Sequence, residues 1–222
     1  EQTGVALITL DSSAENSIVV CPGANGTVDS DEILAALEAL PVLKMIMLQL
    51  EIPMDCVERT VAYAAQRGIP VFLDPAPVPP EGLPEELYAK LTYIAPNSIE
   101  AELLTGIHVC DTASARAAAQ FFLARGVKNA IIKLGSHGVY AANEQGEQLI
   151  HPYHVDAIDT TAAGDTFGGA FCARISGGSS LEDALHFANA AGAFSTTRAG
   201  AQPAMPSLEE INLFLQEKGD VR

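Results

Sequence analysis

The sequence predicts an α/β fold in which crossover helices cover both faces of a largely parallel sheet, with a small β appendage at the start. Three observations favour this fold. From residue 45 to residue 134, short apolar runs alternate with amphipathic stretches, as in consecutive βαβ units. In the first 20 residues, two β-like runs flank the polar stretch Asp11 to Asn16, which is typical of a hairpin. The 222 residues, 48% of them hydrophobic, are enough for one domain with a sizeable core.

The expected strands are short apolar runs bounded by turn residues. In chain order they are Val5–Leu10, Ser17–Val20, Met45–Leu50, Val71–Leu73, Tyr93–Ala95, Ala130–Leu134, Val139–Ala142 and Gln148–His151. The five prolines between Asp74 and Glu85 indicate an ordered loop rather than a domain boundary.

The expected helices carry start and stop signals beside their apolar periodicity. They are Asp29–Leu40, Met54–Arg67, Ser98–Thr105, Thr112–Arg125, Ala163–Ile175, Leu181–Thr196 and Leu208–Gln216. Pro53 lies in a first turn, and Gly68 and Gly126 follow two helix ends. Ser179-x-x-Glu182 and Ser207-x-x-Glu210 have the pattern of capping boxes.

Composition excludes several classes of function. The 12 Lys and Arg against 28 Asp and Glu give a net charge of −16, which disfavours binding to nucleic acid or to an anionic membrane surface. A small anion is still possible, because backbone N–H groups at a helix N-terminus bind phosphate without basic side chains. The four cysteines form no CxxC pair, so we expect reduced, mostly buried thiols rather than a zinc site or disulfides. The pair His151 and His154 is not expected to bind a metal.

The start of the chain lacks a basic region and an apolar region, so no signal peptide is indicated. The longest apolar run, Val42 to Leu50, is far shorter than the about 20 residues that a membrane-spanning helix needs. We therefore expect a cytoplasmic protein.

The segment Asp159-Thr160-Thr161-Ala162-Ala163-Gly164-Asp165-Thr166-Phe167 is the strongest candidate for chemistry. Small residues ending in Gly164 open a helix, so free N–H groups can approach an anion closely. Asp165 would then be a general base that takes a proton from a substrate hydroxyl. The alternative is an ordinary first turn, in which Asp and Thr are favoured for capping and dipole reasons.

Within that segment, Thr161-Ala162-Ala163-Gly164-Asp165-Thr166-Phe167 closely resembles the C-terminal signature of the ribokinase-like (PfkB) family of sugar kinases. Six further segments resemble the family in the same order along the chain. They are Pro22-Gly23-Ala24-Asn25, Leu48-Gln49-Leu50-Glu51, Asp74-Pro75-Ala76-Pro77, Pro96-Asn97-x-x-Glu100-Ala101-Glu102, Leu134-Gly135-Ser136-x-Gly138 and Thr197-Arg198-x-Gly200-Ala201-Gln202-Pro203.

The resemblance implies a three-layer α/β/α sandwich with part of a small β lid, and ATP-dependent phosphorylation of a primary hydroxyl of a furanose sugar. D-ribose is the favoured sugar; another family substrate, such as fructose, ketodeoxygluconate or a nucleoside, and a non-catalytic nucleotide-binding remnant stay open. By the same resemblance, Asp165 is the catalytic base, Ala162, Ala163 and Gly164 form the anion hole, and Glu51 hydrogen-bonds the sugar hydroxyls. A solvated Glu51 is the alternative.

The resemblance also implies contacts with nucleotide and metal ions. Nucleotide contacts fall on Asn97, Lys133, Leu134, Gly135, Ser136, His137, Gly138, Gly164 and Asn189. Glu100 would act on Mg²⁺ through water, although Asn97 and Glu100 could equally be a capping pair. A monovalent cation, K⁺, falls on Asp159, Thr161, Ser195, Arg198 and Gly200. Ala204 stands where the family usually has Ser, which predicts the loss of one oxygen ligand.

The resemblance begins about a third of the way into the family's chain. Residues 1–222 are therefore expected to be the C-terminal two-thirds of a single domain, with about residues 1–20 belonging to the lid. Such a piece alone is expected to be poorly stable and inactive on ribose. The family also suggests a homodimer formed through the lid.

Overall fold

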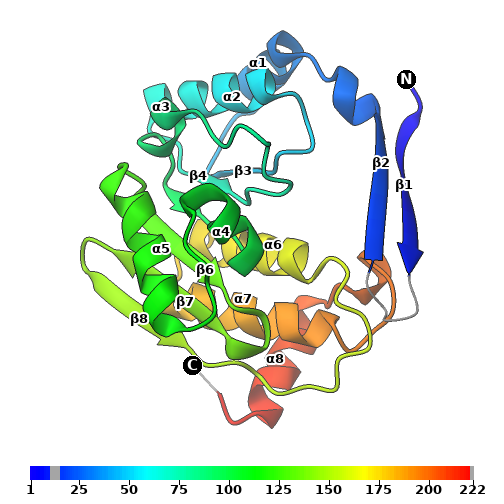
Figure 1. The fold of residues 1–222 in the computed structure, drawn as a ribbon, viewed down its shortest axis with the longest axis vertical. Coiled ribbons are helices and arrows are strands. Elements are labelled where there is room, and N and C mark those ends of the chain that lie inside the picture. Colours follow the sequence, from blue (N-terminus) through cyan, green and yellow to red (C-terminus); the bar gives the residue numbers. More distant parts are fainter. Residues whose placement is uncertain (11–15, 221–222) are drawn as a thin grey trace.

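The computed structural model describes residues 1–10 and 16–220. Its main body is a six-stranded sheet, in the order β3-β4-β5-β6-β7-β8, between two layers of helices (Figure 1). The strands are β1 (Thr3–Leu10), β2 (Asn16–Gly23), β3 (Ile46–Leu48), β4 (Val71–Leu73), β5 (Tyr93–Ile94), β6 (Asn129–Lys133), β7 (Val139–Asn143) and β8 (Gly146–Ile150). The α-helices are α1 (Ser30–Ala39), α2 (Met54–Arg67), α3 (Glu85–Tyr88), α4 (Ser98–Thr105), α5 (Thr112–Ala124), α6 (Ala163–Ser176), α7 (Leu181–Ser195) and α8 (Leu208–Glu217). Single 3₁₀ turns occur at η1 (Ala24–Thr27), η2 (Gly135–His137) and η3 (Gln202–Ala204).

The sheet is parallel from β3 to β6 and antiparallel from β6 to β8. Helices cover both of its faces, as predicted. The crossover helices, which connect the parallel strands, lie on one face only. Because the parallel strands follow one another in sequence order, crossovers of the same hand place α2, α4 and α5 on one face. The opposite face is covered by α6 and α7, which follow the last strand. The expectation of crossover helices on both faces is corrected in this respect.

The central strands are buried on both sides, which explains their continuous apolar runs. In β4, Val71 and Leu73 face the core that contains α2 and α5, whereas Phe72 faces α6. The rings of Phe72 and Phe171 lie 5.4 Å apart between their centroids. A third cluster, around Phe187 and Phe214, packs α8 against α7.

Local signals predicted most helix ends. Helix α2 ends at Gly68 in the left-handed conformation, and Ser207 caps α8 in a capping box with Glu210. The expected box at Ser179 is wrong by one residue, because Ser180 caps α7 and accepts from the N–H of Asp183. The short helix α3 was not expected from the sequence.

The first two strands pair antiparallel, with Val5 opposite Cys21 and Leu7 opposite Val19, which confirms the expected hairpin. Its connection, residues 11–15, lies outside the described residues. The hairpin lies beside the body rather than in the main sheet (Figure 1).

The cysteines are all free, but only Cys56 is buried. Cys172 is half-buried, and burial raises the pKa of its thiol to about 12. Cys21 and Cys110 are exposed, which corrects the expectation of mostly buried thiols. Within residues 1–10 and 16–220, every helix is too short or too polar to cross a bilayer.

Candidate active site

The first turn of α6 leaves backbone donors open. Ala162 precedes the helix in the left-handed conformation, with φ 58° and ψ 15°, and no side chain of the described chain caps the helix. Ala163 donates to the Thr160 carbonyl at 3.2 Å, but the N–H groups of Gly164 and Asp165 have no acceptor among the described residues. Five other helices (α1, α4, α5, α7 and α8) carry a side-chain cap. Open N–H groups at the positive end of a 14-residue helix are suited to an anion.

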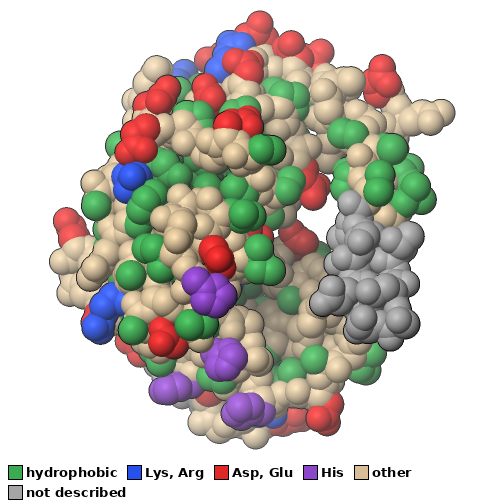
Figure 2. Space-filling model, in the orientation of Figure 1, with side chains coloured by type: hydrophobic (Ala, Val, Ile, Leu, Met, Phe, Trp, Pro, Cys, Tyr) green, Lys and Arg blue, Asp and Glu red, His purple; other side chains and the backbone are tan. Residues whose placement is uncertain are grey.

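Asp165 lies in this same turn and is partly buried. Its Oδ1 accepts a hydrogen bond from the Nε2 of Gln49 at 2.7 Å. Gln49 comes directly after β3, so the contact joins the end of a strand to the start of a helix 116 residues later. In Figure 1, this turn of α6 lies on the side of the body that faces the hairpin. Figure 2 shows a hollow between the body and the hairpin.

A buried ion pair lies beneath the turn. Lys133, the last residue of β6, donates from Nζ to both carboxylate oxygens of Asp74, at 2.8 and 2.7 Å. Their side chains are 12% and 3% exposed, so both charges are removed from water. Burial raises the pKa of Asp74 and the Asp165 charge adds to this, while Lys133 opposes it. A Cβ added at Gly164 would lie 3.4 Å from this Nζ, so the backbone of the turn lies against the pair.

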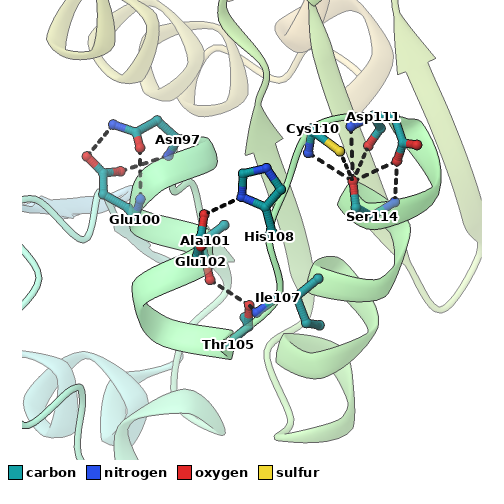
Figure 3. Close-up of polar contacts among 10 residues, drawn as sticks. All are labelled: Asn97, Glu100, Ala101, Glu102, Thr105, Ile107, His108, Cys110, Asp111 and Ser114. Carbon is teal, nitrogen blue, oxygen red and sulfur yellow. Dashed lines mark hydrogen bonds and ion pairs between the residues drawn. The ribbon is translucent and has the colours of Figure 1, made fainter.

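Asn97 and Glu100 form a capping box at the start of α4 (Figure 3). The Glu100 carboxylate accepts from the backbone N–H and the side-chain amide of Asn97, at 2.7 and 2.6 Å, which confirms the capping alternative. Burial raises the pKa of Glu100, and its hydrogen bond from Asn97 and the charge of Lys133 oppose the rise. A parallel bridge joins Asn97 to Lys133, so the box adjoins the buried ion pair.

The predicted nucleotide loop is the turn between β6 and β7. Leu134 is buried, and Gly135, Ser136 and His137 are exposed in η2. Gly138 has φ 93°, and a Cβ there would lie 2.1 Å from the Ile150 carbonyl oxygen, so only glycine fits. Asn189 is buried on α7, and its amide donates to the His151 carbonyl at 2.8 Å.

Three of the five predicted cation residues come together. Asp159 accepts from the N–H of Thr161 at 2.9 Å and from the N–H of Gly200 at 2.8 Å. The hydrogen bond from the Thr161 side chain, together with these two backbone hydrogen bonds, lowers the pKa of Asp159 to about 2.

The side chains of the other two cation residues point elsewhere. The Ser195 hydroxyl donates back to the Gly192 carbonyl within α7, and the Arg198 guanidinium pairs with Glu210. Ala204 is buried beside this region, in η3. Ser195 and Arg198 could therefore reach a cation here only through backbone carbonyls.

Glu51 is exposed just beyond β3, two residues after Gln49. Within the part of the chain that the structure describes, there is no group of three His, Cys, Asp or Glu side chains placed to bind a metal. The site thus consists of an open helix start, one carboxylate, and polar groups at the carboxyl ends of parallel strands.

The comparisons with known proteins agree with this geometry. The model for "pfkB family carbohydrate kinase" matches residues 1–208. The chain belongs to the pfkB family of carbohydrate kinases. Its reaction class is therefore phosphoryl transfer to an alcohol.

Individual relatives within the pfkB family are similar over nearly the whole chain. A ribokinase of Staphylococcus aureus is 40% identical over 212 residues, which are 95% of this chain and 69% of that protein. The structure of a Thermotoga maritima ribokinase matches with a TM-score of 0.83 and 38% identity, over 96% of this chain and 69% of that one. The structure of an Arabidopsis thaliana ribokinase complexed with ribose and ATP matches with a TM-score of 0.84 and 29% identity, over 96% of this chain and 69% of that one. The predicted sandwich fold is confirmed.

Sequence reasoning did not single out the side chains of Gln49 and Asp74, or the left-handed conformation of Ala162. The first two do carry a signal, because each is a polar residue directly after a buried apolar strand. The conformation of Ala162 has no such signal, because alanine rarely adopts positive φ.

Proposed function

We propose that this protein is an ATP-dependent kinase that phosphorylates the 5-hydroxyl of D-ribose. The observation that carries the proposal is the first turn of α6, where two open N–H groups lie beside a carboxylate fixed by Gln49. This arrangement supplies what phosphoryl transfer asks of a protein, namely positioning and stabilisation of charge.

In the proposed reaction, Asp165 accepts the proton of the sugar hydroxyl. The freed oxygen forms a bond to the γ-phosphorus of ATP, the bond from that phosphorus to the bridging oxygen breaks, and ADP leaves. The anion hole assigned to Ala162, Ala163 and Gly164 faces the transferred group, with the N–H groups of Gly164 and Asp165 as the open donors, because the Ala163 N–H already donates to the Thr160 carbonyl. The proton on Asp165 then returns to solvent.

Glu51 is assigned to the sugar hydroxyls, because it follows β3 in the same strand-end segment as Gln49. The segment Lys133 to Gly138 is assigned to the nucleotide through its backbone, since the Lys133 ammonium is already held by Asp74. Asn189 borders the same region through its bond to His151.

Two cations complete the proposal. Asn97 and Glu100 would hold Mg²⁺ through water, and their carboxylate and amide oxygens are a suitable hard donor set. Asp159, Thr161 and Gly200, with backbone carbonyls near Ser195 and Arg198, would hold K⁺. When bound, these ions neutralise phosphate charge and the adjoining backbone dipoles.

Asp165→Asn, made in the enzyme from its complete natural reading frame, tests the base. We expect turnover of D-ribose to fall by at least about 100-fold, because the amide cannot take the proton. Binding of ATP, measured by calorimetry, should stay within a factor of two, because the N–H groups are kept. A wild-type rate in this variant would exclude Asp165 as the base, and a panel of fructose, ketodeoxygluconate and nucleosides would identify a different sugar.

The cation is tested by salt exchange at constant ionic strength. We expect a higher rate with ATP and sugar in KCl than in NaCl, because exchanging hydration water for protein oxygens costs less for K⁺ than for the more strongly hydrated Na⁺. Equal rates in the two salts would contradict the K⁺ assignment.

We also propose a homodimer formed through the hairpin and a cytoplasmic location. Val5, Leu7 and Val19 are between 56% and 61% exposed on one face of this two-stranded sheet, and a second copy would cover them. The exposed free thiols Cys21 and Cys110 are suited to a reducing compartment.

A further inference from the structure

Gln49 is the side chain that holds the carboxylate of Asp165. Its Nε2 donates to Oδ1 at 2.7 Å, and no other described side chain is hydrogen-bonded to this carboxylate. The nearby Lys133 ammonium is engaged by both oxygens of Asp74 instead. The orientation of the Asp165 carboxylate therefore depends on one neutral amide.

The backbone on both sides of this contact is fixed. Leu48 accepts from the N–H of Asp74 at 2.9 Å, and Leu50 donates to the Ala76 carbonyl at 2.9 Å, so Gln49 lies between two anchored residues. On the helix side, a Cβ added at Gly168 would lie 2.5 Å from the Met47 side chain and 3.3 Å from Phe72. This close approach brings the first turn of α6 within reach of Gln49.

A neutral donor is the chemically appropriate partner for a base. A lysine or arginine here would pair with the carboxylate and reduce its tendency to take a proton. An amide hydrogen-bonds to one oxygen of the carboxylate and thereby fixes the plane of the group. The other oxygen can then face the sugar hydroxyl. The oxygen of a general base has to lie within about 3 Å of the hydroxyl oxygen whose proton it accepts, so this orientation bears directly on rate.

We propose that Gln49 is a positioning residue for the general base: it binds Oδ1 of Asp165 and thereby directs Oδ2 to the hydroxyl that is phosphorylated. The inference rests on the proposed function, since it takes Asp165 as the base. It adds a role for a side chain 116 residues away in the sequence.

The test uses the enzyme made from its complete natural reading frame. Gln49→Met keeps the length of the side chain and removes the donor, whereas Gln49→Glu keeps the shape and places an acceptor against the carboxylate. We expect kcat to fall about 10- to 100-fold in both, with the KM values for ATP and for ribose within about twofold of wild type. Gln66→Met, at an exposed position on α2, is the matched control and should keep the wild-type rate.

A double-substitution cycle separates positioning from general damage. In the Asp165→Asn background, adding Gln49→Met should change the residual rate less than about twofold, because the group to be positioned is already gone. The affinity of each variant for ATP, measured by calorimetry, shows whether the variant is folded. If Gln49→Met does not fold, Gln49→Glu takes its place in the cycle.

Three results would overturn the inference. A wild-type kcat in Gln49→Met and Gln49→Glu would show that the contact has no role in catalysis. A raised KM for ribose at unchanged kcat would make Gln49 a sugar-binding residue. Additive losses in the cycle would show damage unrelated to Asp165. If Asp165→Asn itself turns over at the wild-type rate, the proposed function fails, and this inference fails with it.

Discussion

Ala162 adopts the left-handed backbone conformation that L-residues avoid, directly before the helix that carries the candidate base. It is the one described residue other than glycine with positive φ. In that conformation a Cβ lies too close to the neighbouring carbonyl oxygen, which costs about 1–2 kcal/mol. With Ala162 in this conformation, the N–H groups of Gly164 and Asp165 have no acceptor among the described residues. The strained residue therefore lies at the candidate functional site.

Replacement of Ala162 tests this conformation. We expect Ala162→Gly to raise the free energy of unfolding by up to about 1 kcal/mol, and Ala162→Val to lower it, because a β-branched side chain fits positive φ least. Denaturant titration measures both. The control is Ala173→Gly at an exposed interior position of α6, which should destabilise by about 1 kcal/mol. Equal losses from the two glycine substitutions would contradict the left-handed conformation.

At the scale of elements, Asp159 joins two segments that are far apart in the sequence. It binds the N–H of Thr161, just before α6, and the N–H of Gly200, after α7. Both bonds favour the ionised carboxylate, and the side-chain and backbone hydrogen bonds from Thr161 and Gly200 lower its pKa from 3.8 to about 2. The α6 and α7 helices are thereby joined beside the proposed cation site.

The lowered pKa predicts a pH dependence of stability. Because the pKa is lower in the folded state, the contribution of Asp159 is fully present above pH 3.8 and is lost as the pH falls toward about 2. We expect Asp159→Asn to lose stability less steeply than wild type across this window, in thermal unfolding at successive pH values. Asp156→Asn, at an exposed position, controls for the removed charge. Parallel curves for wild type and Asp159→Asn would contradict the linkage.

Prediction of elements succeeded where the signals are local. Helix α4 was predicted with its bounds, because the box between Asn97 and Glu100 and the stop at Gly106 lie within ten residues. The start of α7 was predicted correctly at Leu181, but its cap was assigned to Ser179 instead of Ser180, because both serines are followed three residues later by an acid. Placing the crossover helices on both faces was wrong because strand order cannot be read from local signals.

At the scale of the whole molecule, the hairpin exposes apolar side chains while the acidic surface elsewhere disfavours nonspecific association. In Figure 2, acidic side chains outnumber basic ones on the visible face, and hydrophobic side chains gather on the hairpin. Burying such a patch against a second copy is favourable at about 25 cal/mol per Å² of apolar area.

We expect Leu7→Asp combined with Val19→Asp to convert a dimer into a monomer, because these two residues are opposite each other on one face of the hairpin and four charges would meet in the apolar interface. Sedimentation velocity at micromolar concentrations measures the change, and Leu213→Asp on the exposed face of α8 is the control. A monomeric wild-type protein, or a dimer that survives both substitutions, would contradict the proposed interface.

The sequence by itself determined the fold class, most elements, the family and the start of α6 as the candidate site. These rest on periodicity, caps and motifs, each contained within a few consecutive residues. Only the tertiary structure decided which groups meet: Gln49 with Asp165, Lys133 with Asp74, and Asp159 with Gly200. The partners in these contacts are separated by 116, 59 and 41 residues, so each contact depends on strand order and on how closely the helices pack. The length of 222 residues and the amino-acid composition contain no information about strand order or about helix packing.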